Sequence, residues 1–217
     1  MGRAAIAVVD YGMGNLRSVS KALEHVAPER EVVVTADAET VARAERVVFP
    51  GQGAMPDCMA ALDSRGLREA VLAAAREKPF LGICIGQQML FEHSEEGDTA
   101  GLGIFPGTAH RFPPARMIGA GGARLKVPHM GWNTVRQTAA HPLWRDIPDL
   151  ARFYFVHSYY MDCALSGAEA CTAGSTDYGL PFTSACARDN IFAVQFHPEK
   201  SARAGLALLA NFVAWRP

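Results

Sequence analysis

The stretch that most constrains the fold of this chain is PFLGICIGQQMLFE, residues 79–92. Residues 80–83 are apolar and short, which favours a buried strand, and an amphipathic helix is expected to start near Ile85. Cys84 stands at the junction, with one glycine two residues before it and another two residues after it. This is the pattern of a nucleophile elbow, a tight strand-to-helix turn that presents a nucleophilic side chain, and the helix N-terminus stabilises a thiolate. Because free cysteines are also often buried core residues, the stretch alone leaves both interpretations open.

Strand-like and helix-like segments alternate through the first half of the chain. The predicted strands are 4–9, 31–35, 46–49 and 80–83, and the longer predicted helices are 16–26 and 56–78, the latter with a break near 64–66. Such alternation predicts crossover connections and a parallel sheet, which binds ligands at the carboxyl ends of its strands. The loops 10–15 and 50–53 and Cys84 all follow predicted strands. We therefore expect them to meet at one crevice.

After about residue 95 the sequence changes to short strands separated by glycine and proline turns. One such strand is predicted at 124–127, a hairpin turn at Asp189-Asn190, and a closing helix from 202 to about 215 with Ser201 as its cap. The glycine-rich stretch 116–122 predicts a long loop with no assigned role. The expected fold is a single α/β domain over residues 1–217. Its central sheet is mixed and largely parallel, flanked by helices, with an antiparallel extension in the C-terminal half.

Composition excludes several classes of function. The 21 basic and 22 acidic side chains leave a net charge of -1, which argues against a nucleic-acid partner. There is no apolar run of roughly 18 residues, and the N-terminus leads directly into a predicted strand, so we expect no membrane association and a cytoplasmic location. The cysteines lack C-x-x-C spacing and the glycine turns match no full phosphate-binding motif. We expect reduced thiols, no metal and no cofactor. The five cysteines are Cys58, Cys84, Cys163, Cys171 and Cys186.

A base for Cys84 is available at FAVQFHPEK, residues 192–200. In an extended chain His197 and Glu199 point to the same side, so the carboxylate can orient the imidazole. A solvated charge pair on an edge strand would give the same sequence. Only the combination of the thiol, the imidazole and the carboxylate is specific.

That combination resembles the class I glutamine amidotransferases. The resemblance rests on GICIG around Cys84, on Gln88, and on FHPE around His197, while PGQG at 50–53 falls where the family has its oxyanion loop. Three further motifs, DYGMGNLRSV at 10–19, PHMGWN at 128–133 and FVHSYY at 155–160, resemble the glutaminase subunits of imidazole glycerol phosphate synthase, a histidine-pathway enzyme. The resemblance spans essentially the whole chain.

The resemblance implies a flavodoxin-like fold and hydrolysis of L-glutamine to glutamate and ammonia through a thioester on Cys84. His197 would serve as acid and base, and Glu199 would orient it. The oxyanion would be held by the backbone N–H of Ile85 and by one from the loop of Gly51, Gln52 and Gly53. By the same resemblance, glutamine would be held by Gln88, Ser158 and Tyr159, with Glu96 as a weaker candidate.

The implied partner is a separate cyclase subunit with a (β/α)₈-barrel fold, bound as a heterodimer. It would receive the ammonia through a tunnel and make imidazole glycerol phosphate and AICAR. The candidate interface residues are Asn15, Met130, Trp132, Asn133 and Lys200. A core tryptophan and a solvated lysine are the competing interpretations of Trp132 and Lys200.

Two alternatives for the whole chain stay open. One is a glutaminase subunit that serves another synthase, of anthranilate, aminodeoxychorismate, guanylate or pyridoxal phosphate. The other is a regulatory subunit that has lost turnover. The motifs at 10–19 and 128–133 argue against the first, and the presence of Cys84, His197 and Glu199 argues against the second.

Overall fold

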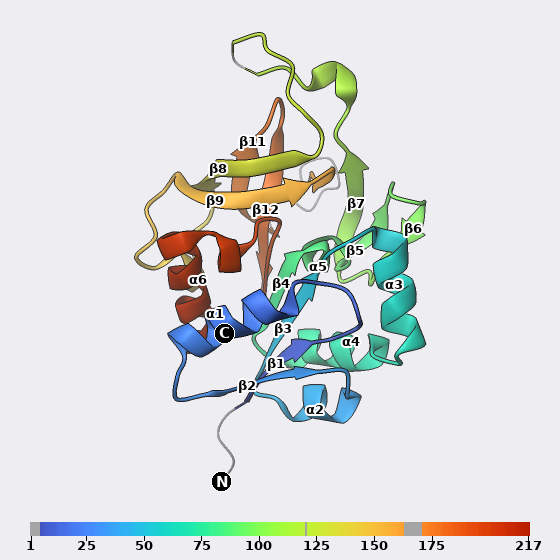
Figure 1. Ribbon diagram of the computed structural model, residues 1–217, viewed down its shortest axis with the longest axis vertical. Helices are drawn as coiled ribbons and strands as arrows, with labels where there is room; N and C mark the ends of the chain where they lie inside the picture. The colour runs from blue at the N-terminus through green and yellow to red at the C-terminus, as the bar shows by residue number, and fades with distance from the viewer. Residues whose placement is uncertain (1–4, 120, 163–170) are drawn as a thin grey trace.

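The computed structural model describes residues 5–119, 121–162 and 171–217 of the chain. A mixed sheet runs through it in the order β2-β1-β3-β4-β13-β12-β10-β7-β5-β6, and β11, β8 and β9 branch from β12 (Figure 1). The predicted α/β fold with a largely parallel centre and an antiparallel extension is confirmed. Cys163 lies outside the described residues.

The centre of the parallel part of the sheet is fully buried. The parallel strands are β1 (Ala5–Val9), β2 (Glu31–Thr35), β3 (Arg46–Gly51), β4 (Phe80–Cys84) and β13 (Ile191–Val194). Every residue of β3, β4 and β13 is buried, as expected for parallel strands covered on both faces. Gly51 and Cys84 therefore stand at the ends of two fully buried neighbouring strands.

The other strands form the extension. They are β5 (Phe91–Ser94), β6 (Thr99–Ala100), β7 (Phe105–Arg111), β8 (His129–Gln137), β9 (Ala151–His157), β10 (Tyr159–Met161), β11 (Thr172–Asp177) and β12 (Pro181–Arg188). Strands β12 and β13 are antiparallel neighbours joined at Asp189-Asn190, so the predicted hairpin is confirmed. Strands β8 and β9 form an antiparallel pair above the parallel strands in Figure 1.

The helices are α1 (Leu16–Val26), α2 (Ala38–Arg43), α3 (Met55–Ser64), α4 (Arg68–Glu77), α5 (Ile85–Gln88) and α6 (Ala202–Ala214). Short 3₁₀ turns lie at η1 (Pro114–Arg116), η2 (Pro142–Trp144) and η4 (Pro198–Lys200). Helix α1 packs against α6, and α2 packs against α4 (Figure 1). The predicted break near residues 64–66 separates α3 from α4. None of the helices in the described residues is long and apolar enough to cross a membrane.

Two sequence predictions were wrong in extent. Helix α5 ends at Gln88, because the carbonyls of Met89 and Leu90 accept hydrogen bonds from the N–H groups of Leu102 and Ile104 instead of continuing the helix. The predicted strand at 124–127 is reduced to a single bridge between Ile118 and Arg124. Its backbone bonds are used within a local hairpin, in which Leu125 donates to Met117.

Candidate active site

Cys84 ends β4 and caps α5 with the strained backbone of a nucleophile elbow. Its φ of 57° and ψ of -113° lie where residues with a Cβ are rare, and it is 4% exposed. Gly86 makes this turn possible, because a Cβ there would lie 1.9 Å from the carbonyl oxygen of Phe49. The glycine after the thiol is thus required by the close approach of β3.

His197 and Glu199 form a buried pair beside this elbow. Nδ1 of His197 lies 2.8 Å from Oε1 of Glu199, and the two side chains are 4% and 1% exposed. The sequence predicts an extended chain at these two residues. In the structure they instead lie at the start of η4, with His197 just before it and Glu199 within it. The contact predicted between the two residues is present, although the local backbone differs.

Strand β9 fixes the backbone of His197. The N–H of His197 donates to the carbonyl of Tyr154 over 2.9 Å, and the Ser201 hydroxyl donates to the carbonyl of His197. The same hydroxyl accepts the N–H of Tyr154 over 2.9 Å. Ser201 therefore makes no side-chain cap of α6, contrary to the prediction, because its hydroxyl is used to join η4 to β9.

The surroundings of His197 favour its charged form. Burial lowers its pKa, but the charge of Cys84, together with the charge and the hydrogen bond of Glu199, outweighs burial and raises the pKa from 6.5 to about 10. Its Nε2 is buried and makes no hydrogen bond with the described residues. The ring is thus held as a proton donor with one N–H available.

A cavity of about 250 Å³ lies over the thiol and the imidazole. Its lining includes most of the residues that the sequence analysis assigned to the site: Gln52, Gly53, Cys84, Ile85, Gln88, Glu96, Ser158, Tyr159 and His197. Gly51 lies next to the elbow, since a Cβ added at Gly51 would lie 2.9 Å from the Cβ of Ile85. Pro128, Val156 and His157 also line the cavity and were not predicted there. Their place in the motifs at 128–133 and 155–160 could have indicated that they lie at the site.

Gln88 is held at the floor of this cavity. Its side-chain N–H group donates to the carbonyl of Tyr159 over 3.2 Å and to Oε1 of Gln195 over 2.8 Å. Its own Oε1 is buried without a partner in the described residues, so it can accept a hydrogen bond from a ligand. Gln195 in turn places its Nε2 3.7 Å from Sγ of Cys84, a contact that the sequence analysis missed.

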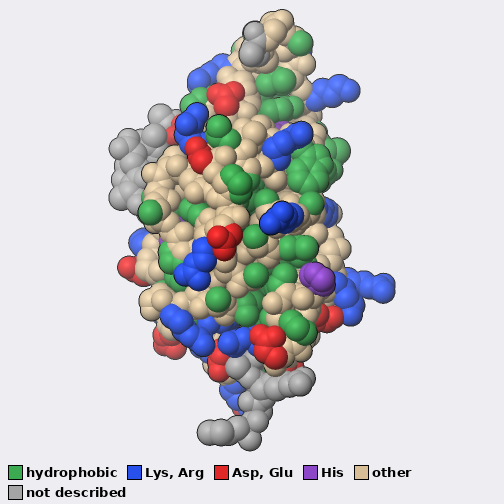
Figure 2. Space-filling view, turned by 90° about the vertical axis from the view of Figure 1, so that its left-hand side faces the viewer, with side chains coloured by type: hydrophobic (Ala, Val, Ile, Leu, Met, Phe, Trp, Pro, Cys, Tyr) green, Lys and Arg blue, Asp and Glu red, His purple; other side chains and the backbone are tan. Residues whose placement is uncertain are grey.

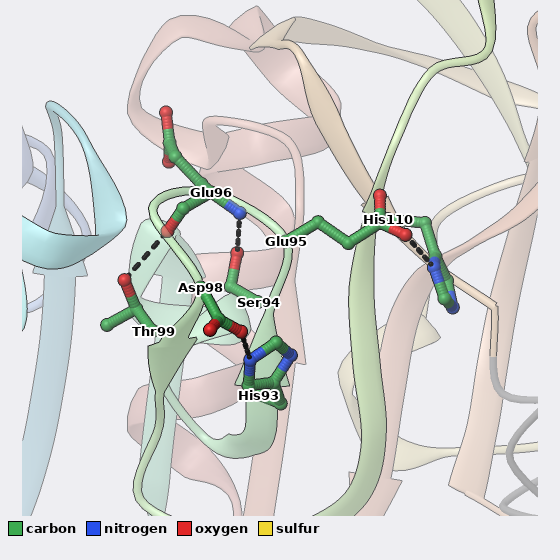
Figure 3. A network of polar contacts seen from close by, with 7 residues as sticks. All are labelled: His93, Ser94, Glu95, Glu96, Asp98, Thr99 and His110. Carbon is green, nitrogen blue, oxygen red and sulfur yellow. Dashed lines mark hydrogen bonds and ion pairs between the residues drawn. The ribbon is translucent and has the colours of Figure 1, made fainter.

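Glu96 reaches the cavity from a turn that fixes its backbone. Figure 3 shows its N–H bonded to the Ser94 hydroxyl and its carbonyl bonded to the Thr99 hydroxyl, with Glu95 extending the other way to His110. One carboxylate oxygen of Glu96 accepts the N–H of Met55, 2.9 Å away, at the start of α3. The other carboxylate oxygen has no hydrogen-bond partner among the described residues.

The loop of residues 51–53 is anchored through two carbonyl groups. The Tyr11 hydroxyl donates to the carbonyl of Pro50 over 2.9 Å, and the Cys58 thiol donates to that of Gln52 over 3.6 Å. Burial raises the pKa of Cys58 to about 11, so the thiol keeps its proton. Because N–H and C=O of a trans peptide point in opposite directions, the N–H of Gly53 points away from Cys58.

The five predicted interface residues lie outside this cavity. Met130 and Trp132 are 62% and 44% exposed, so Trp132 is not a core residue. Figure 2 shows hydrophobic side chains near the edge of the molecule at the level of β8 and β9. Asn133 lines a second cavity of about 330 Å³ together with His129 to Trp132. Asn15 and Lys200 lie at α1 and η4, which contact each other.

A family model described as "Glutamine amidotransferase class-I" matches residues 7–215. The chain belongs to the class-I glutamine amidotransferase family. Two relatives of this chain are named imidazole glycerol phosphate synthase subunit HisH. The protein of Aromatoleum aromaticum is 67% identical over 98% of this chain and 99% of its own length, and that of Dechloromonas aromatica is 67% identical over 98% and 97%.

A solved structure supports the fold alone. The glutaminase domain of Trypanosoma brucei CTPS, with bound acivicin, matches this class-I glutamine amidotransferase with a TM-score of 0.64 at 16% identity. The match covers 99% of this chain and 95% of that one.

Proposed function

We propose that this chain is the glutaminase subunit of an imidazole glycerol phosphate synthase and that Cys84, His197 and Glu199 hydrolyse L-glutamine in the 250 Å³ cavity. The observation that carries the proposal is the shared cavity itself. Cys84 and His197 both line it, and the Glu199 carboxylate lies 2.8 Å behind the imidazole. The high identity to HisH relatives supports the choice of synthase over the other glutaminase partners.

The first half of the reaction uses a thiolate and an imidazolium. Sγ of Cys84 attacks the side-chain carboxamide carbon of glutamine, and the carbonyl electrons move to oxygen. As the tetrahedral intermediate collapses, Nε2 of His197 gives its proton to the leaving nitrogen, and ammonia departs. The raised pKa of His197 suits this role, since the ring is protonated at neutral pH before glutamine binds.

The second half regenerates the enzyme. Neutral His197 takes a proton from water, whose oxygen attacks the thioester carbon, and Cys84 leaves as a thiolate while glutamate forms. Glu199 holds Nδ1–H of the ring throughout, which fixes the tautomer that exposes Nε2.

Two backbone N–H groups would stabilise the oxyanion. Ile85 is the first residue of α5, so its N–H has no acceptor within the helix. The N–H of Gly53 is the second candidate, because its peptide is tethered through the Gln52 carbonyl to Cys58. Loss of one such donor typically lowers kcat by roughly 10² to 10³.

The proposal includes one folded domain of residues 1–217, a cytoplasmic location, and a heterodimer with a (β/α)₈-barrel cyclase. The partner would dock on the exposed side chains of Met130 and Trp132, with Asn15, Asn133 and Lys200 at its margin. Delivery to a bound partner suits the chemistry, because ammonia released into water is mostly protonated and then no longer nucleophilic.

The test is steady-state glutamate release from glutamine, with and without a cyclase subunit carrying its ribotide substrate or a product analogue. We expect strong stimulation by the loaded cyclase, and its disappearance in Cys84→Ala. Turnover that ignores the cyclase would point to another synthase. No turnover in a verified complex would support a regulatory subunit instead.

A further inference from the structure

We propose that His129 and His157 are positioning residues that lock the floor of the glutamine pocket and tie it to Asn133 at the second cavity. The two histidines face each other directly in the β8–β9 register. His157 lines the active-site cavity and His129 lines the second cavity. The identity of the ligand in the pocket rests on the proposed function, but the arrangement of the histidines does not.

The hydrogen bonds along this pair can run in only one direction. The Tyr159 carbonyl is an acceptor, so Nδ1 of His157, 2.7 Å away, must donate to it. Nε2 of neutral His157 is then an acceptor, and Nδ1 of His129 donates to it over 2.9 Å. Nε2 of His129 accepts from the side-chain amide of Asn133, 3.3 Å away. Both rings are therefore assigned the Nδ1–H tautomer.

The aromatic surroundings keep both rings neutral and fixed in orientation. The His129 ring is stacked between Tyr178 and Phe155, with centroid distances of 3.9 Å and 4.8 Å and interplanar angles of 22° in both cases. Burial lowers the pKa of His129 to about 4 and that of His157 to about 3. A proton added to either ring would set one N–H against another N–H, so the chain of bonds requires neutral rings.

This series of hydrogen bonds runs from the glutamine pocket at one end to the predicted partner surface at the other. At one end, the Tyr159 carbonyl is held by Nδ1 of His157 and by the Gln88 side chain, which bond it at 2.7 Å and 3.2 Å. At the other end, the Asn133 side chain also donates to the Asp177 carbonyl over 2.9 Å. Asn133 directly follows the exposed Trp132. A partner that moves Asn133 therefore acts on the bonds that place Tyr159.

The first test is spectroscopic and does not require activity. In protein labelled with ¹⁵N-histidine, we expect both His129 and His157 to show a protonated Nδ1 and an unprotonated Nε2 between pH 6 and 8. The variants His129→Asn and His157→Asn assign the signals. An Nε2–H tautomer or a doubly protonated ring at either position would overturn the proposal.

The second test separates positioning from simple packing in the complex with saturating cyclase. His129→Leu removes the donor to His157, whereas His129→Asn places an amide N–H near the position of Nδ1. We expect His129→Leu to raise the KM for glutamine roughly tenfold, with kcat changed less than about threefold, and His129→Asn to recover most of the loss.

An unchanged KM in His129→Leu, or equal impairment in the two variants, would refute the positioning role. If His129→Leu does not fold, the tautomers of the wild-type protein still decide the proposal. If wild-type complex releases no glutamate, the proposed function fails, while the spectroscopic result still stands on its own.

Discussion

The strained turn at Cys84 predicts that a glycine there stabilises the protein more than an alanine does. The φ of 57° and ψ of -113° disfavour any residue with a Cβ. Such strain is worth about 1–3 kcal/mol, and the greater freedom of glycine in the unfolded chain removes about 0.5–1 kcal/mol of that gain. Taking the middle of each range, Cys84→Gly should therefore exceed Cys84→Ala in free energy of unfolding by about 1 kcal/mol. Both variants lose the side-chain sulfur beside His197, so the effect of that loss cancels in the comparison.

The assay is urea unfolding of the two variants side by side at pH 7, followed by circular dichroism, with thermal melting as a second readout. For a protein of this size, 1 kcal/mol corresponds to roughly 2–4 °C in Tm. Equal stability, or a more stable Cys84→Ala, would show that the backbone at Cys84 stores no strain.

Three further predictions concern Gly86, Glu199 and His129. Gly86→Ala should prevent stable folding, because its Cβ would lie 1.9 Å from the Phe49 carbonyl oxygen; soluble yield and unfolding midpoint measure this. Glu199→Gln should lower kcat by at least roughly 10²-fold and shift the titration of His197, followed by NMR, to lower pH, because it removes the charge that helps hold the imidazolium. The pKa of His129 is about 4 in the folded protein and near 6.5 when unfolded, so its stabilising contribution is complete above pH 6.5 and is lost as pH falls towards 4. This loss is on the order of 3 kcal/mol, and urea unfolding at pH 7 and pH 4.5 should show a smaller decrease in His129→Asn than in wild type.

The local motifs were readable from sequence because the chemistry lies within a few residues. The elbow needs a glycine where β3 approaches it, and the glycine after Cys84 marks that position. His197 and Glu199 are two residues apart, so their contact survives even though η4 replaces the expected extended chain.

The features that sequence reasoning missed depend on contacts between distant segments. Helix α5 stops after Gln88 because N–H groups from residues 102–105 bond the next carbonyls, which no local pattern reveals. The pairing of His129 with His157 follows from the register of β8 against β9. Gln195 reaches Cys84 only because β13 lies beside β4.

The central claim is that Cys84 forms a covalent bond to the glutamyl group of glutamine. We would mix the complex with glutamine, quench it with acid and map peptides by mass spectrometry. We expect a glutamyl thioester on the peptide that contains Cys84, and no such thioester in Cys84→Ala. Efficient glutamate release without a modified Cys84 peptide, or with modification at another residue, would contradict this claim.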